Sequence, residues 1–460
     1  MRELIAEQIA HYVAHSRFAE LPPRVVQQCK MVILDSLACT LGGYDTPIGR
    51  SMVELIAELG GSPLCTVVGS GHKTSCLLAA FANAAMNNIL ECDDALLSVT
   101  HPSAIIVPAV LAAGEMVSSS GQDIILATSL GYDVLGRVCS AMSPTEERLR
   151  QVRGLGAPFG GAVAAGKLLG LTEEQMVNAL GIAGAYAPVS PLRKTLFSEL
   201  GPTMIKNNYG YLAEVEVMSA LMARKGFTGP RDIFEGDDGF WRMYGSDRCD
   251  LGKITEGLGQ DYLIMQSRLK PYPARRGIHT VIACAENIRQ NHKIDADKID
   301  TVVVTTQAQS PGAPYDNAKP RSIAEAVVSI PYLTALALTG VEPGTDWYTE
   351  SRLKNKALLS LARKVRVVTK PEFDDFPRGG MGAKMQVTVK GTTYEAKVRE
   401  PKGTPNNPMT CQEVEQKFGS FATNVIRQVK AEEAIRLLRQ LENLPDVNVL
   451  TELFRGMSKA

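Results

Sequence analysis

PPRVVQQCKMVILDSLACTLGG, residues 22–43, is the stretch of this chain that indicates the fold most directly. Its apolar residues recur at steps of three and four, as in Cys29, Ile33 and Leu37, which is the spacing of one face of an α-helix. Two prolines open the stretch, and Gly42-Gly43 stands where a helix commonly ends. The stretch therefore predicts one long helix with a defined start and stop.

The same spacing recurs up to about residue 245, in segments rich in Ala and Gly. Small side chains let helices approach closely, so this half of the chain is predicted to be a packed helical bundle. Thr172, followed by two acids, is typical of a helix N-cap. The predicted helices are SCLLAAFANAAMNNIL (75–90), SAIIVPAVLAAGEMV (103–117), DIILATSLGYDVLGRVC (123–139), GAVAAGKLLG (161–170), TEEQMVNALGIAGAYA (172–187) and AEVEVMSALMARKG (213–226).

The pattern changes near Tyr262. Three β-branched segments follow, at 298–309, 364–373 and 383–398, and Lys390-Gly391 is a candidate hairpin turn in the last of them. Helical segments return between the strands and again at the end of the chain. The predicted fold is mainly α, with a large discontinuous all-helical domain and a smaller α+β lid domain. The helical domain is expected to span 1–262 and 405–460, and the lid 263–404.

The amino-acid composition limits the classes of partner and the cellular compartment that can be expected. The 460 residues include 49 Lys plus Arg and 49 Asp plus Glu, so no overall charge favours nucleic acid or an anionic membrane surface. The nine cysteines form no CxxC pair and no Cys/His cluster at zinc-ligand spacing, which is typical of reduced thiols in a cytosolic protein. The N-terminus lacks a secretory signal, and no charge-free transmembrane span is evident. We expect a cytoplasmic protein.

The first candidate site is ECDDALLSVTHPS, residues 91–103, which places Asp93 and Asp94 shortly before His101. His101 precedes Pro102, a residue that suits the first turn of a helix, and a helix N-terminus attracts anions such as a substrate carboxylate. The alternative is that the two acids cap helices and that the histidine fills a polar corner. The residues alone favour neither interpretation.

The second candidate site is SRLKPYPARRGIHT, residues 267–280. It holds five cations or potential cations around two prolines that stiffen the loop. Arginine binds carboxylates through two parallel hydrogen bonds and lysine adds a point charge, so the loop suits a small polyanion. A solvated basic loop is the alternative, but a position at a domain junction favours binding. The five residues are Arg268, Lys270, Arg275, Arg276 and His279.

Other motifs exclude several classes of enzyme. The glycine-rich stretch 153–170 follows no strand, so it is interpreted as helix packing and not as a dinucleotide site. The second such stretch, 376–387, carries Arg378 and is either a lid loop or a plain hairpin. No GxSxG, Walker A or HExxH motif is present, so serine hydrolase, NTPase and zinc protease functions have no support.

Together these segments resemble the MmgE/PrpD family, which includes 2-methylcitrate dehydratase, cis-aconitate decarboxylase and iminodisuccinate epimerase. The resemblance runs over nearly the whole chain, in the family's order. It implies a helical domain with an α+β lid, a homodimer, an active site between the domains, and neither metal nor organic cofactor. The motifs are DDALLSVTHPSAIIVPAVLA, GAPFGGAVAAGKLLGLTEEQMVNALGIAGA, ARKGFTGPRDIFEGDDGFWRMY, LKPYPARRGIHTVIA and SIPYLTALAL.

The resemblance also implies roles for single residues. His101 matches the family's active-site histidine, Lys270 the lysine before the tyrosine-proline pair, and His279 the histidine that closes that motif. Tyr315, in APYDN, matches a substrate-contacting tyrosine of the lid. Catalytic roles are therefore assigned to His101, Lys206, Lys270 and Asp93, and substrate binding to Glu91, Asp94, Arg153, Arg275, Arg276, His279 and Tyr315.

Departures from the family pattern affect the expected chemistry. Relatives commonly read DFDDT where this chain has ECDDA, so Glu91 replaces the first acid and Ala95 a threonine. Where many relatives have a histidine and a threonine, this chain has Gln151 and Arg153. A further histidine of the family is replaced by Asn208, close to the displaced Lys206, and a cysteine of the family is replaced by Arg275.

The resemblance then implies an enzyme that moves a proton, or a carboxylate, at a carbon next to a carboxylate of a small di- or tricarboxylate. Cations would stabilise the enolate-like charge, and His101 with Lys206 or Lys270 would transfer the proton. Dehydration also needs an acid for the leaving hydroxide, and histidines are missing here. We therefore expect an epimerase or isomerase, with a dehydratase or decarboxylase lyase as the first alternative and an inactive polyanion-binding relative as the second.

Overall fold

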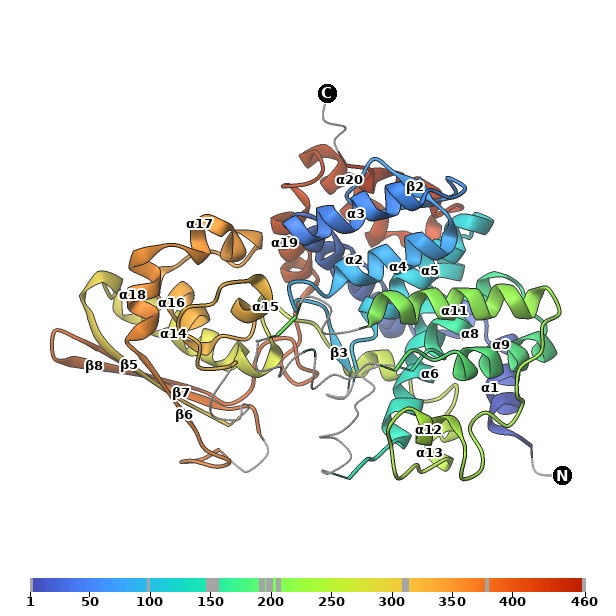
Figure 1. Ribbon diagram of the computed structural model, residues 1–460, viewed down its shortest axis with the longest axis horizontal. Coiled ribbons are helices and arrows are strands. Elements are labelled where there is room, and N and C mark those ends of the chain that lie inside the picture. Colours follow the sequence, from blue (N-terminus) through green and yellow to red (C-terminus); the bar gives the residue numbers. More distant parts are fainter. Residues whose placement is uncertain are drawn as a thin grey trace.

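The structure, a computed structural model, describes residues 3–96, 100–145, 157–189, 195, 202–203, 208–307, 314–376 and 380–456. Within these residues the protein is mainly helical and contains small sheets. Figure 1 shows a four-stranded sheet with its helices on one side of the molecule and the other helices, among them α2, α4 and α11, on the opposite side. The mainly α fold is as predicted.

Helix α2, Pro23–Tyr44, is the helix predicted from the opening stretch. Pro23 lies in its first turn, where the missing N–H needs no partner. The glycines do not end the helix, contrary to the prediction, because it continues to Tyr44. A Cβ at Gly43 would lie 1.9 Å from the backbone oxygen of Met86 in α4, Cys76–Asn87, so glycine serves close helix packing here.

The predicted helices of the first half are present, and several begin at a side-chain cap. Thr172 accepts a hydrogen bond from the backbone N–H of Gln175, which confirms the predicted N-cap. Besides α4, the helices in the predicted segments are α5 Ser103–Val117, α6 Gly121–Ala141, α8 Gly160–Leu168, α9 Glu173–Ala185 and α11 Tyr209–Arg224. This part of the chain also contains α1 Ile5–His15, α3 Pro47–Leu59, α12 Phe240–Met243 and α13 Gly252–Thr255.

Helix α6 is the only described helix that is long and apolar enough to cross a membrane, and 94% of its apolar window is buried inside the protein. Arg137, in its last turns, is buried and donates hydrogen bonds to the backbone oxygens of Glu256, Gly257 and Asp261. A buried helix with an internally bonded arginine is typical of a protein core.

Helices α11 and α8 meet at a buried carboxyl group. Oε1 of Glu216 accepts the backbone N–H of Gly161 at 2.8 Å, and Oε2 has no partner among the described residues. A Cβ at position 161 would lie 1.9 Å from Oε2, so a larger residue there would displace this carboxyl group. Burial raises the pKa of Glu216 to about 8, and the hydrogen bond from Gly161 offsets part of that rise.

We expect Glu216→Gln to stabilise the protein at pH 8.5 more than at pH 5. The folded state holds the proton of Glu216 more tightly than the unfolded state, whose pKa is near 4.5. This group therefore stabilises the fold fully below about pH 4.5, and that contribution is lost as the pH rises towards 8. Thermal melts of the parent and of Glu216→Gln at both pH values measure how the stability difference between them depends on pH. An equal rise in melting temperature at both pH values would contradict this expectation. Glu54→Gln, on the exposed face of α3, is the control.

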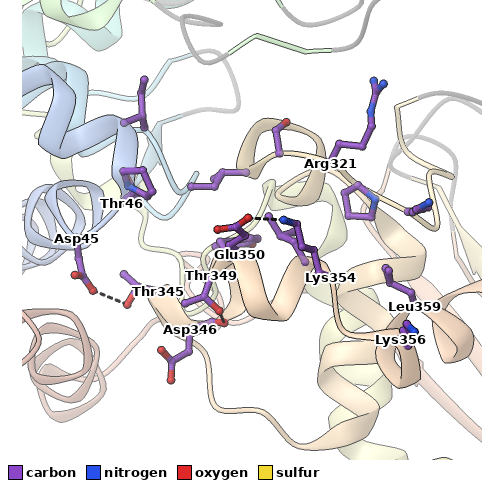
Figure 2. A pocket seen from close by; sticks show the side chains of 18 of the residues that line it. Asp45, Thr46, Arg321, Thr345, Asp346, Thr349, Glu350, Lys354, Lys356 and Leu359 are labelled. Atoms are coloured by element: carbon purple, nitrogen blue, oxygen red, sulfur yellow. Dashed lines mark hydrogen bonds and ion pairs between the residues drawn. The ribbon is translucent and has the colours of Figure 1, made fainter.

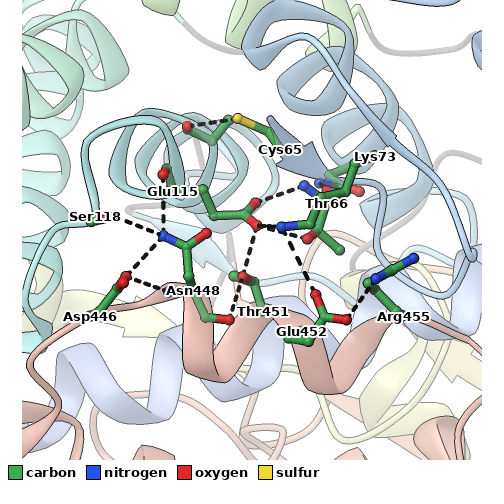
Figure 3. A network of polar contacts seen from close by, with 12 residues as sticks. Cys65, Thr66, Lys73, Glu115, Ser118, Asp446, Asn448, Thr451, Glu452 and Arg455 are labelled. Atoms are coloured by element: carbon green, nitrogen blue, oxygen red, sulfur yellow. Dashed lines mark hydrogen bonds and ion pairs between the residues drawn. The ribbon is translucent and has the colours of Figure 1, made fainter. Parts of the chain in front are cut away.

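The C-terminal helices return to the first half of the chain. Helix α19, Cys411–Ala422, packs against α2, and α20, Gln428–Arg439, follows it. In Figure 3, the buried Glu115 of α5 accepts hydrogen bonds from Thr66 and from Thr451 of α21, Asn448–Thr451. One carboxylate thus joins segments that are far apart in the sequence.

The middle of the chain forms the four-stranded sheet, in the order β6-β5-β7-β8. β5 and β6 are parallel and the other neighbours antiparallel. Lys390 and Gly391 connect β7 to β8 with φ angles of 48° and 79°, which confirms the predicted hairpin turn. The strands are β5 Ile299–Thr306, β6 Val365–Thr369, β7 Ala383–Val389 and β8 Thr392–Val398.

Helices pack on the buried face of this sheet. Helix α14, His279–His292, contacts β7 and β8 and also α16, Ile330–Thr339. The other helices of this part are α15 Ile323–Ala326, α17 Glu350–Leu353 and α18 Lys356–Arg363. The contacts of α19 with α2 and the separate place of the sheet in Figure 1 support the division into 1–262 with 405–460 and 263–404, which we keep as a proposal.

Candidate active site

Two short strands join the acidic segment to the basic loop. β3, Ala95–Leu96, pairs antiparallel with β4, Ser267–Arg268, so that Ala95 lies opposite Arg268. These strands belong to the two stretches that sequence analysis selected independently. The pairing brings a histidine with carboxylates and a group of cations into one region of the molecule.

His101 lies just before α5 and is oriented by a buried carboxylate. Its Nδ1 is 2.9 Å from Oδ2 of Asp93, and Asn88 donates to Oδ1 of the same carboxylate at 2.6 Å. Burial pushes the pKa of Asp93 up, but the charges of Lys270 and His101 outweigh it and hold that pKa below its usual value. An ionised Asp93 makes Nδ1 the protonated nitrogen, so Nε2 is left to exchange a proton with a ligand.

Lys270 shares Asp93 with His101. Its ammonium group is fully buried and lies 3.8 Å from Oδ1 of Asp93 and 3.4 Å from Oε2 of Glu91. It also donates to the backbone oxygen of Glu91 at 2.9 Å. Glu91 adopts a φ of 55°, a left-handed conformation that is unfavourable for this residue and that turns its carbonyl towards the lysine.

Arg275 and Tyr315 form a second contact between the loop and the middle of the chain. The guanidinium carbon of Arg275 lies 5.2 Å from the centre of the Tyr315 ring. Tyr315 is buried, and burial raises the pKa of its phenol, so it remains a neutral hydroxyl. The backbone N–H of Arg275 donates to the oxygen of Val327, which holds the loop in place.

Arg276 is the most unusual side chain of the group. It is 7% exposed, yet none of its three guanidinium nitrogens has a hydrogen-bond partner among the described residues. Burial and the charge of Arg268 lower its pKa to about 10, with Glu400 and Asp94 offsetting part of the shift. Because an arginine in a protein stays protonated, this is a buried cation that needs an anion.

Two residues that were predicted to bind the substrate form hydrogen bonds within the protein. Asp94 is fully buried and accepts hydrogen bonds from the backbone N–H of Ser103 at 2.9 Å and from the hydroxyl of Tyr132 at 2.8 Å. His279 is fully buried, and its Nε2 donates to the backbone oxygen of Ala274 at 2.8 Å. Burial and the charge of Arg276 lower its pKa, and its Nδ1 has no hydrogen-bond partner among the described residues. We propose that Asp94 positions its loop and does not contact the substrate, whereas substrate binding by His279 stays a prediction.

The structure does not place every predicted site residue. Lys206, Arg153, Gln151 and Arg378 lie outside the described residues. The catalytic role of Lys206 and the substrate-binding role of Arg153 stay predictions.

Sequence analysis missed a buried ion pair behind the site. Lys417 of α19 lies 2.6 Å from Oδ1 of Asp35 in α2 and 2.6 Å from the backbone oxygen of Cys92. Cys92 stands between Glu91 and Asp93, the two acids that contact Lys270. Burial raises the pKa of Asp35 to about 6 although Lys417 opposes the shift, so the pair is charged at neutral pH. We propose that Lys417 is a positioning residue.

We expect Lys417→Met to unfold at a lower temperature and to lose turnover. It leaves the carboxylate of Asp35 buried and uncompensated, which costs about 3–5 kcal/mol. The double variant Asp35→Asn/Lys417→Met should regain much of the stability but not the kcat, because Cys92 still lacks its donor. Lys30→Met, which breaks the ion pair of Lys30 with Glu442, is the control that should lower stability alone. A double variant with normal kcat would show that the pair is only structural.

A large cavity lies away from these residues. It measures about 1300 Å³ and opens between the start of α3, the segment before α15 and the surface of α17 and α18. Figure 2 shows Asp45 and Thr345 joined on one side and Glu350 and Lys354 on the other. None of the predicted site residues that the structure describes lines this cavity. Tyr348, which does line it, donates a hydrogen bond from its hydroxyl to the backbone oxygen of Pro273 in the basic loop.

Comparisons with known proteins show which family this chain belongs to. The family model described as MmgE/PrpD N-terminal domain matches residues 7–250, and the C-terminal domain model matches 272–443. Similar curated proteins include cis-aconitate decarboxylase of Aspergillus terreus, 25% identical over 98% of this chain and 95% of the relative. The human protein of that name is 25% identical over 100% of this chain and 96% of the relative. A cis-aconitate decarboxylase-like protein of Aspergillus oryzae is 26% identical over 98% of this chain and 97% of the relative.

Proposed function

Because the chain belongs to the MmgE/PrpD family, we propose that it is a lyase that removes carbon dioxide from a small unsaturated polycarboxylate of the cis-aconitate type. The observation that carries this proposal is Arg276, a buried guanidinium without a partner among the described residues. Arg276 belongs to the basic loop whose strand β4 pairs with β3, and β3 lies in the acidic segment that leads to His101. A polycarboxylate would supply the missing anion.

The names of the relatives revise the expected type of reaction. Sequence analysis preferred an epimerase because dehydration needs an acid for the leaving hydroxide. Decarboxylation has no hydroxide to protonate and needs one proton donor for carbon. The loss of histidines is therefore a smaller handicap for this reaction, and the relatives named as decarboxylases support the lyase alternative.

In the proposed reaction, one group of residues binds the carboxylates and another transfers the proton. Arg276 and Arg275 would hold the carboxylates that stay on the product, through charge-assisted hydrogen bonds. The bond from carbon to the departing carboxylate then breaks, and its electron pair forms a new carbon–carbon double bond while the electron pair of the existing double bond moves to the far carbon of that bond. This shift leaves negative charge on a carbon next to a retained carboxylate, which the nearby cations stabilise.

The final step is protonation of that carbon. His101, held by Asp93 through Nδ1, would deliver the proton from Nε2, and Lys270 would keep the local charge balanced beside Asp93 and Glu91. His101 regains its proton from solvent. We include the homodimer implied by the family in the proposal, and sedimentation of the purified protein tests it.

The test is to incubate the protein in deuterated water with cis-aconitate, 2-methylcitrate and an aspartate-type diacid. We expect carbon dioxide release and a new unsaturated product that carries one deuteron, seen by NMR, with cis-aconitate as substrate. Deuterium at an α-carbon without carbon dioxide would establish an isomerase instead. Release of water alone would establish a dehydratase. A rise in melting temperature without turnover of any acid would favour the inactive, polyanion-binding relative.

A further inference from the structure

Two of the six histidines lie together on the surface, away from the candidate active site. His11 and His15 stand four positions apart in α1, so they share one face of that helix. Their ring centres are 4.2 Å apart. The first residue of α9, Glu173, meets both: its Oε2 is 3.5 Å from Nδ1 of His11 and its Oε1 is 3.5 Å from Nδ1 of His15.

These distances match the geometry of a metal site. Zinc binds imidazole nitrogen and carboxylate oxygen at about 2.0–2.1 Å, and a tetrahedron of that size has edges of about 3.3 Å. One ligand atom from each of the three residues lies within 4.8 Å of the others. The candidate ligand atoms thus lie close together before any ion is bound.

We propose that His11, His15 and Glu173 form a surface site for Zn²⁺ or a similar borderline divalent cation. Paired histidines at this helical spacing are a ligand pattern of zinc sites, and the carboxylate supplies a negative charge. The side chains are 63%, 60% and 47% exposed, so water completes the coordination and the ion exchanges with solvent. The sequence alone does not indicate this site, because Glu173 is far from the two histidines along the chain.

Binding requires one rearrangement. Without metal, Nδ1 of His15 is 2.9 Å from the backbone oxygen of His11 and donates its proton there. The ring therefore offers Nε2 to the ion after a rotation, or gives up this hydrogen bond. Because the site is exposed, the freed carbonyl can bond to water, so the cost is small.

The ion would tie α1 to α9. Arg231 already bridges these helices, through Glu7 of α1 and Glu174 of α9. Figure 1 shows both helices at the end of the molecule that is remote from the four-stranded sheet. Binding would therefore stabilise the first helix of the chain against the helical bundle, independently of catalysis.

Calorimetric titration of the full chain with zinc chloride tests the proposal. The exposed Cys411 is first replaced by serine, since a free thiol also captures zinc. We expect one ion per chain, a rise in melting temperature with zinc, and at least tenfold weaker binding in His11→Gln/His15→Gln and in Glu173→Gln. The matched control, His72→Gln/His292→Gln, removes two exposed histidines that stand apart and should bind zinc normally.

Two results would overturn the proposal. One is zinc affinity in His11→Gln/His15→Gln equal to that of the Cys411→Ser parent, which would place the ion elsewhere. The other is the lack of any saturable binding by the parent. Turnover of polycarboxylate should be the same in all these variants, so the outcome is independent of the proposed lyase function.

Discussion

His101→Asn is expected to lower kcat by about 10²–10⁴-fold while leaving the melting temperature nearly unchanged. The imidazole is held by Asp93 and is 19% exposed, so asparagine can keep the polar contact without leaving a cavity in the core. It cannot exchange a proton near neutral pH. The measurement is steady-state turnover of the substrate identified by NMR, with thermal melts beside it.

A matched variant separates the role of His101 from a general effect of losing a histidine. His72→Asn removes an exposed histidine and should retain full kcat. If His101→Asn kept kcat within tenfold of the parent, His101 would not be the proton donor. Lys270 would then be the first residue to test, because it contacts the same carboxylate.

Arg276→Met is expected to weaken substrate binding and, at the same time, to stabilise the free protein. The buried guanidinium has no partner among the described residues, so an apolar side chain of similar length removes an uncompensated charge from the interior. A lost charge-assisted hydrogen bond to carboxylate is worth about 1.5–3 kcal/mol, which corresponds to a rise in KM of roughly 10–100-fold.

Arg137→Met is the informative comparison. Arg137 is buried to a similar degree, at 6% exposed, but its guanidinium donates to three backbone oxygens. Its replacement should therefore lower the melting temperature, whereas that of Arg276 should raise it. Polycarboxylate should stabilise Arg137→Met but not Arg276→Met. A destabilised Arg276→Met that still binds substrate normally would contradict the assignment.

The opposite signs expected for these two arginines illustrate a general point about sites. A binding residue held ready for an anion costs stability until the anion arrives. A structural residue of the same chemical type has its partners within the fold. Thermal melts with and without ligand can thus distinguish the two without a measurement of activity.

The sequence by itself determined the mainly helical fold, the strand segments of the middle region and the two stretches that carry the candidate site. Helical and strand periods are local properties, so α2, the Thr172 cap and the Lys390-Gly391 turn were predictable from neighbouring residues. The family resemblance, which the matched family models confirm, added the candidate roles of His101 and Lys270.

Only the tertiary structure decided which of these side chains have partners. It paired Asp94 with Ser103 and Tyr132, whereas Arg276 has no partner among the described residues. It also brought Lys417 to Cys92, 325 positions away, and Glu173 to the histidines of α1. Local periodicity says which face of an element is buried but not which distant element will cover it, and the pairing of charges depends on that second fact.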